Sequence, residues 1–495
     1  MSTIPSTDTA PADLEGLSFH LVGIGGAGMS VLALLLAERG ARVSGSDVTE
    51  GRALAGLRAR GLRVVVGHSA DHVPAEATLV VSTAIKEDNP ELVVARSRGQ
   101  EILHRSQALA LAAAGRDFVA VAGAHGKTTT SGMLAQALSE AGQDPSFAVG
   151  GVVRALGTGA HLGSGRAFVA EADESDRSFL NYSPAIELVT NVEPDHLDSY
   201  GSTEAFEKAF ADFADRLVPG GVLIACADDP GALRLARGAG ERGARVITFG
   251  TARPDELPGG DLVGEAHVVL EITDRRAGST GAALTRWTAG PAGLQASAPV
   301  ALELSLPGDH VALDAAGAWA AGLELGVGAE QMARALGSFG GTGRRFEDRG
   351  EAGGVRVVDD YAHHPTEIEA LMKAARSVAQ ERGGRVLVLF QPHLFSRTRD
   401  FAERFGAALG RADLVVVTAV YAAREVAEDF PGVSGLTVAE RVPGGRGRYV
   451  ADRLQAAEEL AGAARRGDLL LTVGAGDVTE IADVVLAHLR VGEAR

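Results

Sequence analysis

The sequence predicts an α/β fold built from three domains, with mostly parallel sheets. Short apolar runs that end at glycine loops or acidic clusters alternate with helical patterns, as is typical of parallel α/β domains. The chain has 495 residues, and a prior of roughly 150 residues per domain gives about three. We expect a flexible tail at 1–15, followed by domains at 16–115, 116–340 and 341–495.

Composition excludes several classes of protein. Hydrophobic residues make up 46% of the chain and charged residues 22%, which describes soluble globular material. The net charge of -17 argues against a nucleic acid partner. The longest aliphatic run, 31–37, is far shorter than the ~20 residues of a membrane span, so we expect no membrane partner. The single cysteine, Cys226, is expected in a buried strand and indicates a reducing, cytoplasmic location.

The first domain opens with a glycine loop between a strand at 17–22 and a helix at 29–39, which is G-x-G-x-x-G in its proper context. A second strand, 41–46, leads to Asp47, where such folds place an acid that binds ribose. The motif fits NAD and a uridine diphosphate sugar equally and leaves both open. The candidate residues for this site are Gly23, Gly25, Gly26, Ala27, Gly28 and Asp47.

The same alternation continues to about residue 115. The expected strands and helices are 53–60 (helix), 62–66 (strand), 78–82 (strand) and 91–99 (helix). His68, His104 and Arg105 fall at predicted strand ends. A lone histidine at such a position is at least as often structural as functional, so we assign these residues no chemistry.

The second domain opens with a phosphate loop. An apolar strand at 118–122 leads into G-x-x-G-K-T-T, a variant that lacks the first glycine of the Walker pattern, since Val121 stands there. Backbone N–H groups, the helix N-terminus and Lys127 can cradle phosphates, and the Thr128 hydroxyl can bind Mg²⁺. Lysine is rare in this chain, which otherwise uses arginine, yet it occurs here. The ATP-binding candidates are Gly123, Ala124, His125, Gly126, Lys127, Thr128 and Thr129.

Two acidic clusters follow predicted strands at 167–170 and 186–190. The first cluster, 171–176, holds four carboxylates and the second, 191–198, includes His196. Both fall at the carboxyl ends of strands, where α/β sheets bind ligands. Without a cation these acids would repel a triphosphate, so they favour a Mg²⁺ or Mn²⁺ site.

The pattern weakens between 250 and 305, where we expect only short β-like runs at 266–272 and 300–306 and assign no chemistry. An apolar helix is expected at 315–325, and a hinge at 340–343 leads into the third domain. The strands expected in that domain are 355–358, 385–390, 413–417 and 469–473.

Three polar segments border these strands: 344–347, 359–367 and 391–399. Their arginines can hold phosphate or carboxylate bidentately. The adjacent His363 and His364 point different ways and have no third ligand at helical spacing, which argues against a metal site there. A helix is expected to begin at Thr366.

Five motifs in order resemble those of the Mur ligase family. They are GIGGAGMS at 23–30, GAHGKTTT at 123–130, EADESD at 171–176, DDYAHHPTE at 359–367 and FQPH at 390–393. The resemblance covers nearly the whole chain. It implies an N-terminal Rossmann-like domain for a UDP sugar, a central P-loop ATPase-like domain, and a C-terminal Rossmann-like domain for the amino acid.

Within that family the motifs resemble most the members that join L-alanine to the lactyl carboxylate of UDP-N-acetylmuramate. The implied reaction uses ATP and Mg²⁺ or Mn²⁺ and passes through an acyl phosphate, in peptidoglycan precursor synthesis. The implied assembly is a monomer or a homodimer.

The resemblance also assigns roles to residues. It implies that Lys127 binds phosphate, that Thr128, Glu171 and His196 bind metal, that Arg345 reaches the γ-phosphate and that Asp360 lies close to the nucleotide. The group around the incoming alanine would be Tyr361, His363, His393 and Arg397, with His363 as a candidate base. The Gly23–Gly28 loop would cover the UDP diphosphate.

Two departures from the family pattern stand out. The adenine-contacting stretch usually reads His-Asn-x-x-Asn-Ala, whereas this chain has His310, Val311 and Asp314 at the first three named positions. Leu394 stands where many relatives have a second arginine. The first change removes side-chain amide contacts expected to adenine. The second leaves Arg397 to hold the alanine carboxylate without a second arginine.

Three other functions remain open from the sequence. A nicotinamide-dependent oxidoreductase would explain the first glycine loop and Asp47, but not Lys127 or the acidic clusters. A non-catalytic ATP-driven switch is compatible with the altered 310–315 segment. A related ligase that acts on a recycled tripeptide would share every motif.

Overall fold

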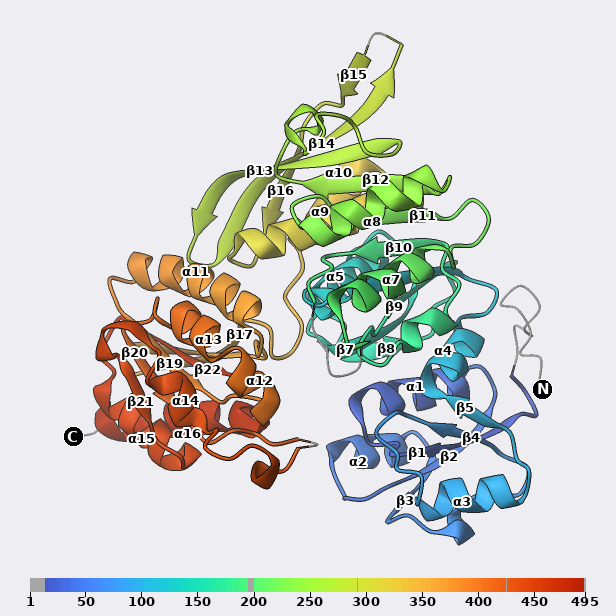
Figure 1. Cartoon of the computed structure of the whole chain (residues 1–495), viewed down its shortest axis with the longest axis horizontal. Coiled ribbons are helices and arrows are strands. Elements are labelled where there is room, and N and C mark those ends of the chain that lie inside the picture. Colours follow the sequence, from blue (N-terminus) through green and yellow to red (C-terminus); the bar gives the residue numbers. More distant parts are fainter. Residues whose placement is uncertain (1–13, 195–199, 292, 424, 494–495) are drawn as a thin grey trace. The chain divides into compact units, whose positions relative to one another are not determined.

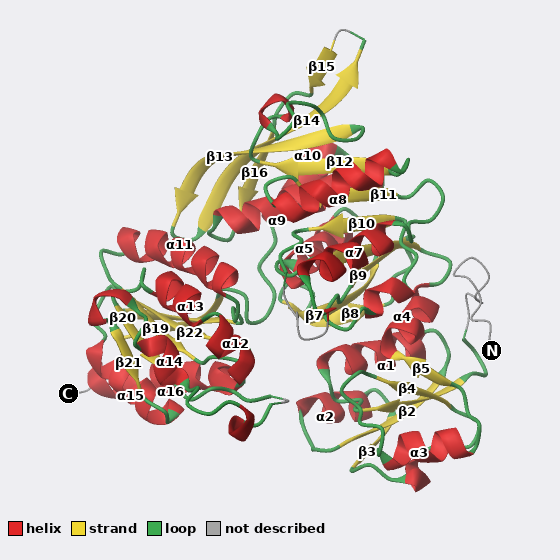
Figure 2. Ribbon diagram, viewed as in Figure 1, coloured by secondary structure: helices red, strands yellow, loops and turns green. Residues whose placement is uncertain are grey.

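The computed structural model describes residues 14–194, 200–291, 293–423 and 425–493. Figure 1 labels its elements, and Figure 2 distinguishes helices from strands. The α/β prediction is confirmed: three sheets are present among the described residues, and most of their strand pairs are parallel. No helix among these residues is both long enough and apolar enough to cross a bilayer.

The first sheet is a five-stranded parallel sheet in the order β3-β2-β1-β4-β5. Its cores lie on both faces: α1, α2 and α4 contribute to one, and α3 to the other. The strands are β1 (Ser18–Val22), β2 (Arg42–Asp47), β3 (Arg63–Val66), β4 (Thr78–Val81) and β5 (Ile102–His104). The helices are α1 (Ala27–Glu38), α2 (Arg52–Ala59), α3 (Pro90–Ser97) and α4 (Arg105–Ala113).

All the elements expected before residue 100 are confirmed to within two residues. The strand end predicted at His104 is confirmed by β5, whereas helix α4 was not predicted, because this three-residue strand passes directly into the helix with no loop between them. His104 caps α4 together with Gln107 in a capping box, so this histidine has a local structural role.

The central sheet has 11 strands in the order β15-β14-β13-β12-β11-β10-β6-β9-β7-β8, with β16 beside β14. The strands up to β12 are β6 (Asp117–Ala122), β7 (Ser146–Val153), β8 (Thr158–His161), β9 (Ala167–Glu171), β10 (Ile186–Val189), β11 (Val222–Cys226) and β12 (Arg245–Gly250). The remaining strands are β13 (Ala266–Arg276), β14 (Ser279–Gly290), β15 (Gly293–Ala296) and β16 (Val300–Leu304). The helices are α5 (Lys127–Glu140), α7 (Thr203–Ala214), α8 (Pro230–Glu241), α9 (Asp309–Glu324) and α10 (Ala329–Gly337).

Cys226 lies in a buried strand, as predicted. The expectation of only short β-like runs between 250 and 305 is wrong, because β13 and β14 have 11 and 12 residues. The second half of each strand, 271–276 and 285–290, is partly or fully exposed, so polar side chains interrupt the apolar pattern that predicts a long strand.

The third sheet has the order β17-β18-β22-β19-β20-β21 and is parallel except for the edge strand β17. One face is covered by α11, α13 and α14, and the other by α15 and α16. The strands are β17 (Glu347–Ala352), β18 (Val355–Asp360), β19 (Val386–Phe390), β20 (Leu414–Val417), β21 (Gly447–Tyr449) and β22 (Leu469–Val473). The helices are α11 (Pro365–Glu381), α12 (Phe395–Asp400), α13 (Ala402–Leu409), α14 (Gly435–Ala439), α15 (Arg453–Ala463) and α16 (Ile481–Glu493).

The chain divides into two compact units. One unit comprises residues up to 271 together with 283–302 and 313–339, and the other comprises 272–282, 303–312 and 340–495. The first two sheets therefore share a unit, while the tips of β13, β14 and β16 group with the C-terminal sheet.

Candidate functional site

The phosphate loop connects β6 to α5 and is held from behind by the segment after β10. Gly123 has φ +132°, and a Cβ there would lie 2.2 Å from Thr190 Oγ1. The His125 N–H donates to Asn191 Oδ1 at 3.0 Å, and the His125 carbonyl accepts from Thr190 Oγ1 at 2.5 Å. Gly126, at φ +84°, is the N-cap of α5 and contributes no side-chain cap. The helix N-terminus is therefore left for an anionic ligand.

Lys127 lies at the centre of this loop. Its Nζ is 2.9 Å and 2.8 Å from Glu174 Oε1 and Oε2 and also donates to the carbonyl of Gly123 at 2.5 Å. Burial alone would lower the pKa of Lys127, but the carboxylates of Glu174, Asp173 and Glu171 outweigh it and raise that pKa. Lys127 is therefore a partly buried cation that is paired with the Glu174 carboxylate at the phosphate loop.

Glu171, at the end of β9, is oriented by two donors. Its Oε1 accepts from the Gly150 N–H at 2.7 Å and from Ser131 Oγ at 3.4 Å. Ser131 and Thr128 both lie at the start of α5. A carboxylate and a threonine hydroxyl are the oxygen ligands that Mg²⁺ takes, so this donor set fits the cation. His196, the third predicted metal ligand, lies outside the described residues.

Two acids of the 171–176 cluster contact the first domain. Arg105 Nη2 is 2.9 Å from Asp173 Oδ2. Asp176 accepts a hydrogen bond from the Thr83 hydroxyl and lies 3.6 Å from His104 Nε2. These carboxylates therefore join the two sheets of this unit, a role that the spacing of the acids did not reveal.

Arg105 is a candidate functional residue to which the sequence analysis assigned no chemistry. A Cβ on Gly28 would lie 3.2 Å from Arg105 Nη1, so this guanidinium lies against the first glycine loop while it pairs with Asp173. Its position at the start of α4, just after a strand, was the available signal. Its two partners lie far away in sequence and could not be inferred.

The first glycine loop is closed by Asp47. The Gly25 N–H donates to Asp47 Oδ2 at 2.8 Å, and a Cβ on Gly25 would lie 2.9 Å from the same oxygen. Gly23 has φ +75°. Gly26 is the N-cap of α1, which begins at Ala27, and has no side-chain cap. The loop thus presents a second helix N-terminus suited to a diphosphate.

The second unit presents Arg345 on a strained turn. Arg344 and Phe346, on either side, have φ of 61° and 45°, values that non-glycine residues rarely adopt. Asp360 holds the turn by accepting from the Phe346 N–H at 2.7 Å, and burial raises the pKa of Asp360 to about 6. Such strain persists only where surrounding contacts enforce it, and it is concentrated at functional sites.

The four residues predicted around the amino acid are brought together. The His363 ring lies 5.3 Å from the Tyr361 ring and 5.7 Å from the His393 ring, and Arg397 is close enough to affect the His363 pKa. Arg397 is buried in the short helix α12. Burial lowers the pKa of His363 to about 3, so its ring is neutral at pH 7. These side chains form a polar group beside a buried arginine, which fits a small carboxylate.

The altered 310–315 segment lies at the start of α9. Val311 is buried and has no polar group to offer. Asp314 lies against the phosphate loop, because a Cβ on Gly126 would be 2.8 Å from Asp314 Oδ1. The departure from the family pattern therefore places a carboxylate beside the expected phosphate site.

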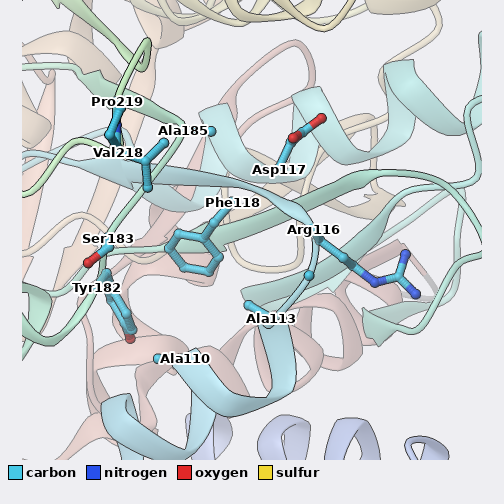
Figure 3. Close-up of a pocket in the computed structure, with 11 residues that line it drawn as sticks. Ala110, Ala113, Arg116, Asp117, Phe118, Tyr182, Ser183, Ala185, Val218 and Pro219 are labelled. Carbon is cyan, nitrogen blue, oxygen red and sulfur yellow. The ribbon is translucent and has the colours of Figure 1, made fainter. Parts of the chain in front are cut away.

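A separate cavity of about 520 Å³ lies at the amino end of β6, the edge opposite the phosphate loop. Figure 3 shows Phe118, Tyr182 and Val218 among its lining residues. None of the predicted site residues lines it.

Family models match three consecutive parts of the chain. They are described as "Mur ligase family, catalytic domain" at 18–117, "Mur ligase middle domain" at 121–322 and "Mur ligase, glutamate ligase domain" at 344–476. The chain belongs to the Mur ligase family.

This Mur ligase is similar to curated and solved relatives over nearly its full length. It is 52% identical over 472 residues to a UDP-N-acetylmuramate--L-alanine ligase of Kineococcus radiotolerans, covering 94% of this chain and 95% of that one. A Thermotoga maritima UDP-N-acetylmuramate-alanine ligase structure has a TM-score of 0.76 at 27% identity, covering 97% of this Mur ligase and all of that chain. A murein peptide ligase of Psychrobacter arcticus shares the fold, with a TM-score of 0.67 at 23% identity, over 96% of this chain and 99% of the other.

Proposed function

We propose that this Mur ligase joins L-alanine to the lactyl carboxylate of UDP-N-acetylmuramate and converts ATP to ADP and phosphate. The observation that carries the proposal is the partly buried Lys127 at a glycine loop whose helix N-terminus has no side-chain cap. The 52% identity to a relative of that name supports the choice of substrates. We also propose the domain boundaries 16–115, 116–340 and 341–495 and a cytoplasmic location.

In the first step a lactyl carboxylate oxygen attacks the γ-phosphorus of ATP, and ADP leaves. Lys127 and Arg345 stabilise the charge on the transferring phosphoryl group, while the backbone of 123–129 holds the other phosphates. Thr128 and Glu171, with His196, would hold a divalent cation, which supplies further positive charge when bound. Asp360 supports the Arg345 turn through the Phe346 N–H.

In the second step the amine of alanine attacks the acyl carbon, and phosphate leaves as the amide forms. Arg397 holds the alanine carboxylate, with Tyr361 and His393 around it. The Nδ1 of His363 donates to the Tyr361 carbonyl at 3.1 Å, so its Nε2 keeps the lone pair. His363 would accept the amine proton there, although a pKa of about 3 makes its ring a weaker base at neutral pH than a histidine with an ordinary pKa.

The first glycine loop holds the UDP diphosphate in this proposal. The helix N-terminus at Gly26 faces the phosphates, Asp47 fixes the loop, and Arg105 adds a positive charge beside Gly28. The acyl phosphate must be kept from water. Because Arg345 and Lys127 belong to different units, both units must engage one nucleotide during turnover. Small-angle scattering should show compaction with ATP and the sugar nucleotide together.

Phosphate release is the decisive measurement. We expect release only when ATP, UDP-N-acetylmuramate and L-alanine are all present. Release that is indifferent to either co-substrate would indicate the ATP-driven switch instead. Competition among L-alanine, glycine, L-serine and tripeptide separates this activity from tripeptide recycling, and preference for the tripeptide would overturn the proposal. We expect no nicotinamide binding.

A further inference from the structure

A fully buried carboxylate in the first domain is surrounded by three histidines. Glu91, the second residue of α3, has no exposed surface. Its Oε2 lies 3.7 Å from His20 Nε2 and 3.4 Å from His68 Nδ1, and its Oε1 lies 3.4 Å from His72 Nδ1. No role in the reaction described above uses these residues. A carboxylate buried this completely is costly unless several donors satisfy it.

Ser46 connects Glu91 to His68. The Ser46 hydroxyl is 2.5 Å from Glu91 Oε2 and 2.9 Å from His68 Nδ1. The Ser69 N–H donates to the other oxygen, Oε1, at 3.2 Å. Burial alone would raise the pKa of Glu91, but the nearby His20 ring and the hydrogen bond from the Ser46 hydroxyl outweigh it and lower that pKa, so the carboxylate is charged.

The direction of these hydrogen bonds fixes the tautomer of His68. The Ser46 hydroxyl has one proton to donate, and it donates this hydrogen bond to the charged Glu91 carboxylate at 2.5 Å. Ser46 Oγ can then only accept from His68, so His68 Nδ1 carries the ring proton. A lone pair on Nδ1 would also face Glu91 Oε2 at 3.4 Å, which is repulsive. The neutral ring therefore keeps its lone pair on Nε2, the edge that faces away from Ser46 and Glu91.

The position of His68 in the sheet indicates which part of a bound nucleotide its Nε2 would contact. The glycine loop follows β1, Asp47 ends β2, and His68 comes two residues after β3, in a sheet with adjacent strands β1, β2 and β3. The Gly67 N–H donates to the Asp47 carbonyl at 2.7 Å, which holds the start of the His68 segment beside the end of β2. Diphosphate, ribose and base follow one another in a nucleotide in the same order as these three strand ends. The His68 side chain is 16% exposed, so it is accessible at this edge.

We propose that Glu91 and Ser46 are positioning residues that hold His68 as a hydrogen-bond acceptor for the imide N–H of the uracil base. This inference rests on the proposed function, since it assumes that the first domain binds a UDP sugar. Uracil has a proton on the ring nitrogen between its two carbonyls, whereas cytosine has a lone pair there. An acceptor held by Glu91 and Ser46 therefore favours uridine over cytidine nucleotides.

The test compares Ser46→Ala with Ser44→Ala in the full-length protein. Ser44 is a matched control because it lies two residues earlier on the same strand, on the same face, and contacts a different histidine, His20, at 2.9 Å. The probes are UDP-N-acetylmuramate and its cytidine analogue. We expect Ser46→Ala to reduce the preference for uridine about five- to tenfold, the loss of one well-placed hydrogen bond. Ser46→Thr should restore it, and Ser44→Ala should keep it.

An unchanged uridine preference in Ser46→Ala would overturn this inference and leave the proposed function intact. A wild-type chain that binds neither nucleotide would overturn both. Nitrogen-15 NMR of histidine-labelled wild-type protein reports the tautomer of His68 directly. The His68→Gln variant is needed only to assign the His68 signal. A proton on Nε2 in place of Nδ1 would overturn the inference even if Ser46→Ala fails to fold.

Discussion

Lys127 forms an ion pair with the buried Glu174, in which Nζ lies within 2.9 Å of both carboxylate oxygens. The side chain of Glu174 is 2% exposed and that of Lys127 is 17% exposed. A lysine held this way is fixed in position but already neutralised. Phosphate must therefore replace the carboxylate when ATP binds.

The first prediction concerns Lys127 itself. Lys127→Met should lower the rate of phosphate release about 100- to 1000-fold, because a fixed positive charge next to the transferring phosphoryl group is lost. Binding of UDP-N-acetylmuramate, measured by calorimetry, should not change. Lys208→Met is the matched control, since Lys208 is exposed and forms an ion pair with Asp212, one turn later on the same helix. Unchanged turnover in Lys127→Met would refute the assigned role.

Glu174→Gln should tighten ATP binding about three- to tenfold, because a neutral amide competes less well than a carboxylate for Lys127. Burial raises the pKa of Glu174, so its charged form depends on Lys127. Fluorescence titration with a labelled nucleotide would measure the change. Weaker binding in the variant would instead show that Glu174 positions Lys127 for the phosphate.

Arg105→Met should raise the KM for the sugar nucleotide about tenfold or more and leave the KM for ATP unchanged. The guanidinium donates a charged hydrogen bond to Asp173 and lies against the Gly28 loop, whereas methionine keeps the approximate length of the side chain without its charge. Arg60→Met serves as the control, since Arg60 is half exposed and 3.9 Å from Glu38. Equal effects on both KM values would point to general loss of structure.

Asp314→Asn should tighten ATP binding several-fold. The carboxylate lies beside Gly126 of the phosphate loop, where its charge repels the phosphates, and asparagine removes that charge without changing size. Asp309→Asn, on the same helix but paired with Arg275 at 2.8 Å, should have no effect on ATP. A loss of affinity in Asp314→Asn would show that the carboxylate recognises the nucleotide.

The last prediction concerns stability. Glu187, in β10, is fully buried between Ala120 and Leu223 of the neighbouring strands, and neither of its carboxylate oxygens has a hydrogen-bond partner among the residues that the structure describes. Burial raises its pKa well above 4.5. The folded chain then keeps the Glu187 proton at pH values where the unfolded chain has lost it, so this group makes stability fall as pH rises above 4.5.

Glu187→Leu should therefore raise the free energy of unfolding by about 1–3 kcal/mol at neutral pH, by less at pH 4, and weaken the pH dependence. Urea unfolding of the two proteins between pH 4 and pH 8 measures the difference. Glu187→Gln should also weaken the pH dependence, but it should raise the free energy of unfolding by less than Glu187→Leu does, because its polar amide is still buried. A difference between Glu187→Leu and the wild type that does not vary with pH would contradict the assignment.

Local sequence patterns predicted many of the elements because both the strand and helix signals are short-range. The run 118–122 and the glycines at 123 and 126 were sufficient for strand β6, the loop and helix α5, since the backbone conformations they require are set by neighbouring residues. The same reasoning failed for β13 and β14. Their partly exposed faces carry polar residues, so pairing with neighbouring strands, which the sequence does not display, determines their length.

The sequence by itself determined the α/β class, the two glycine loops and the presence of acids after β9 and β10, because each depends on residues adjacent in the chain. Only the tertiary structure decided which acid serves which partner: Glu174 pairs with Lys127, Asp173 with Arg105, and Glu91 with His68 through Ser46. The contacts that make these pairs, including the one between Ser46 and His68, join residues between 22 and 68 positions apart. Their energies depend on burial and on distances of a few ångströms, which arise only when the strands are placed side by side.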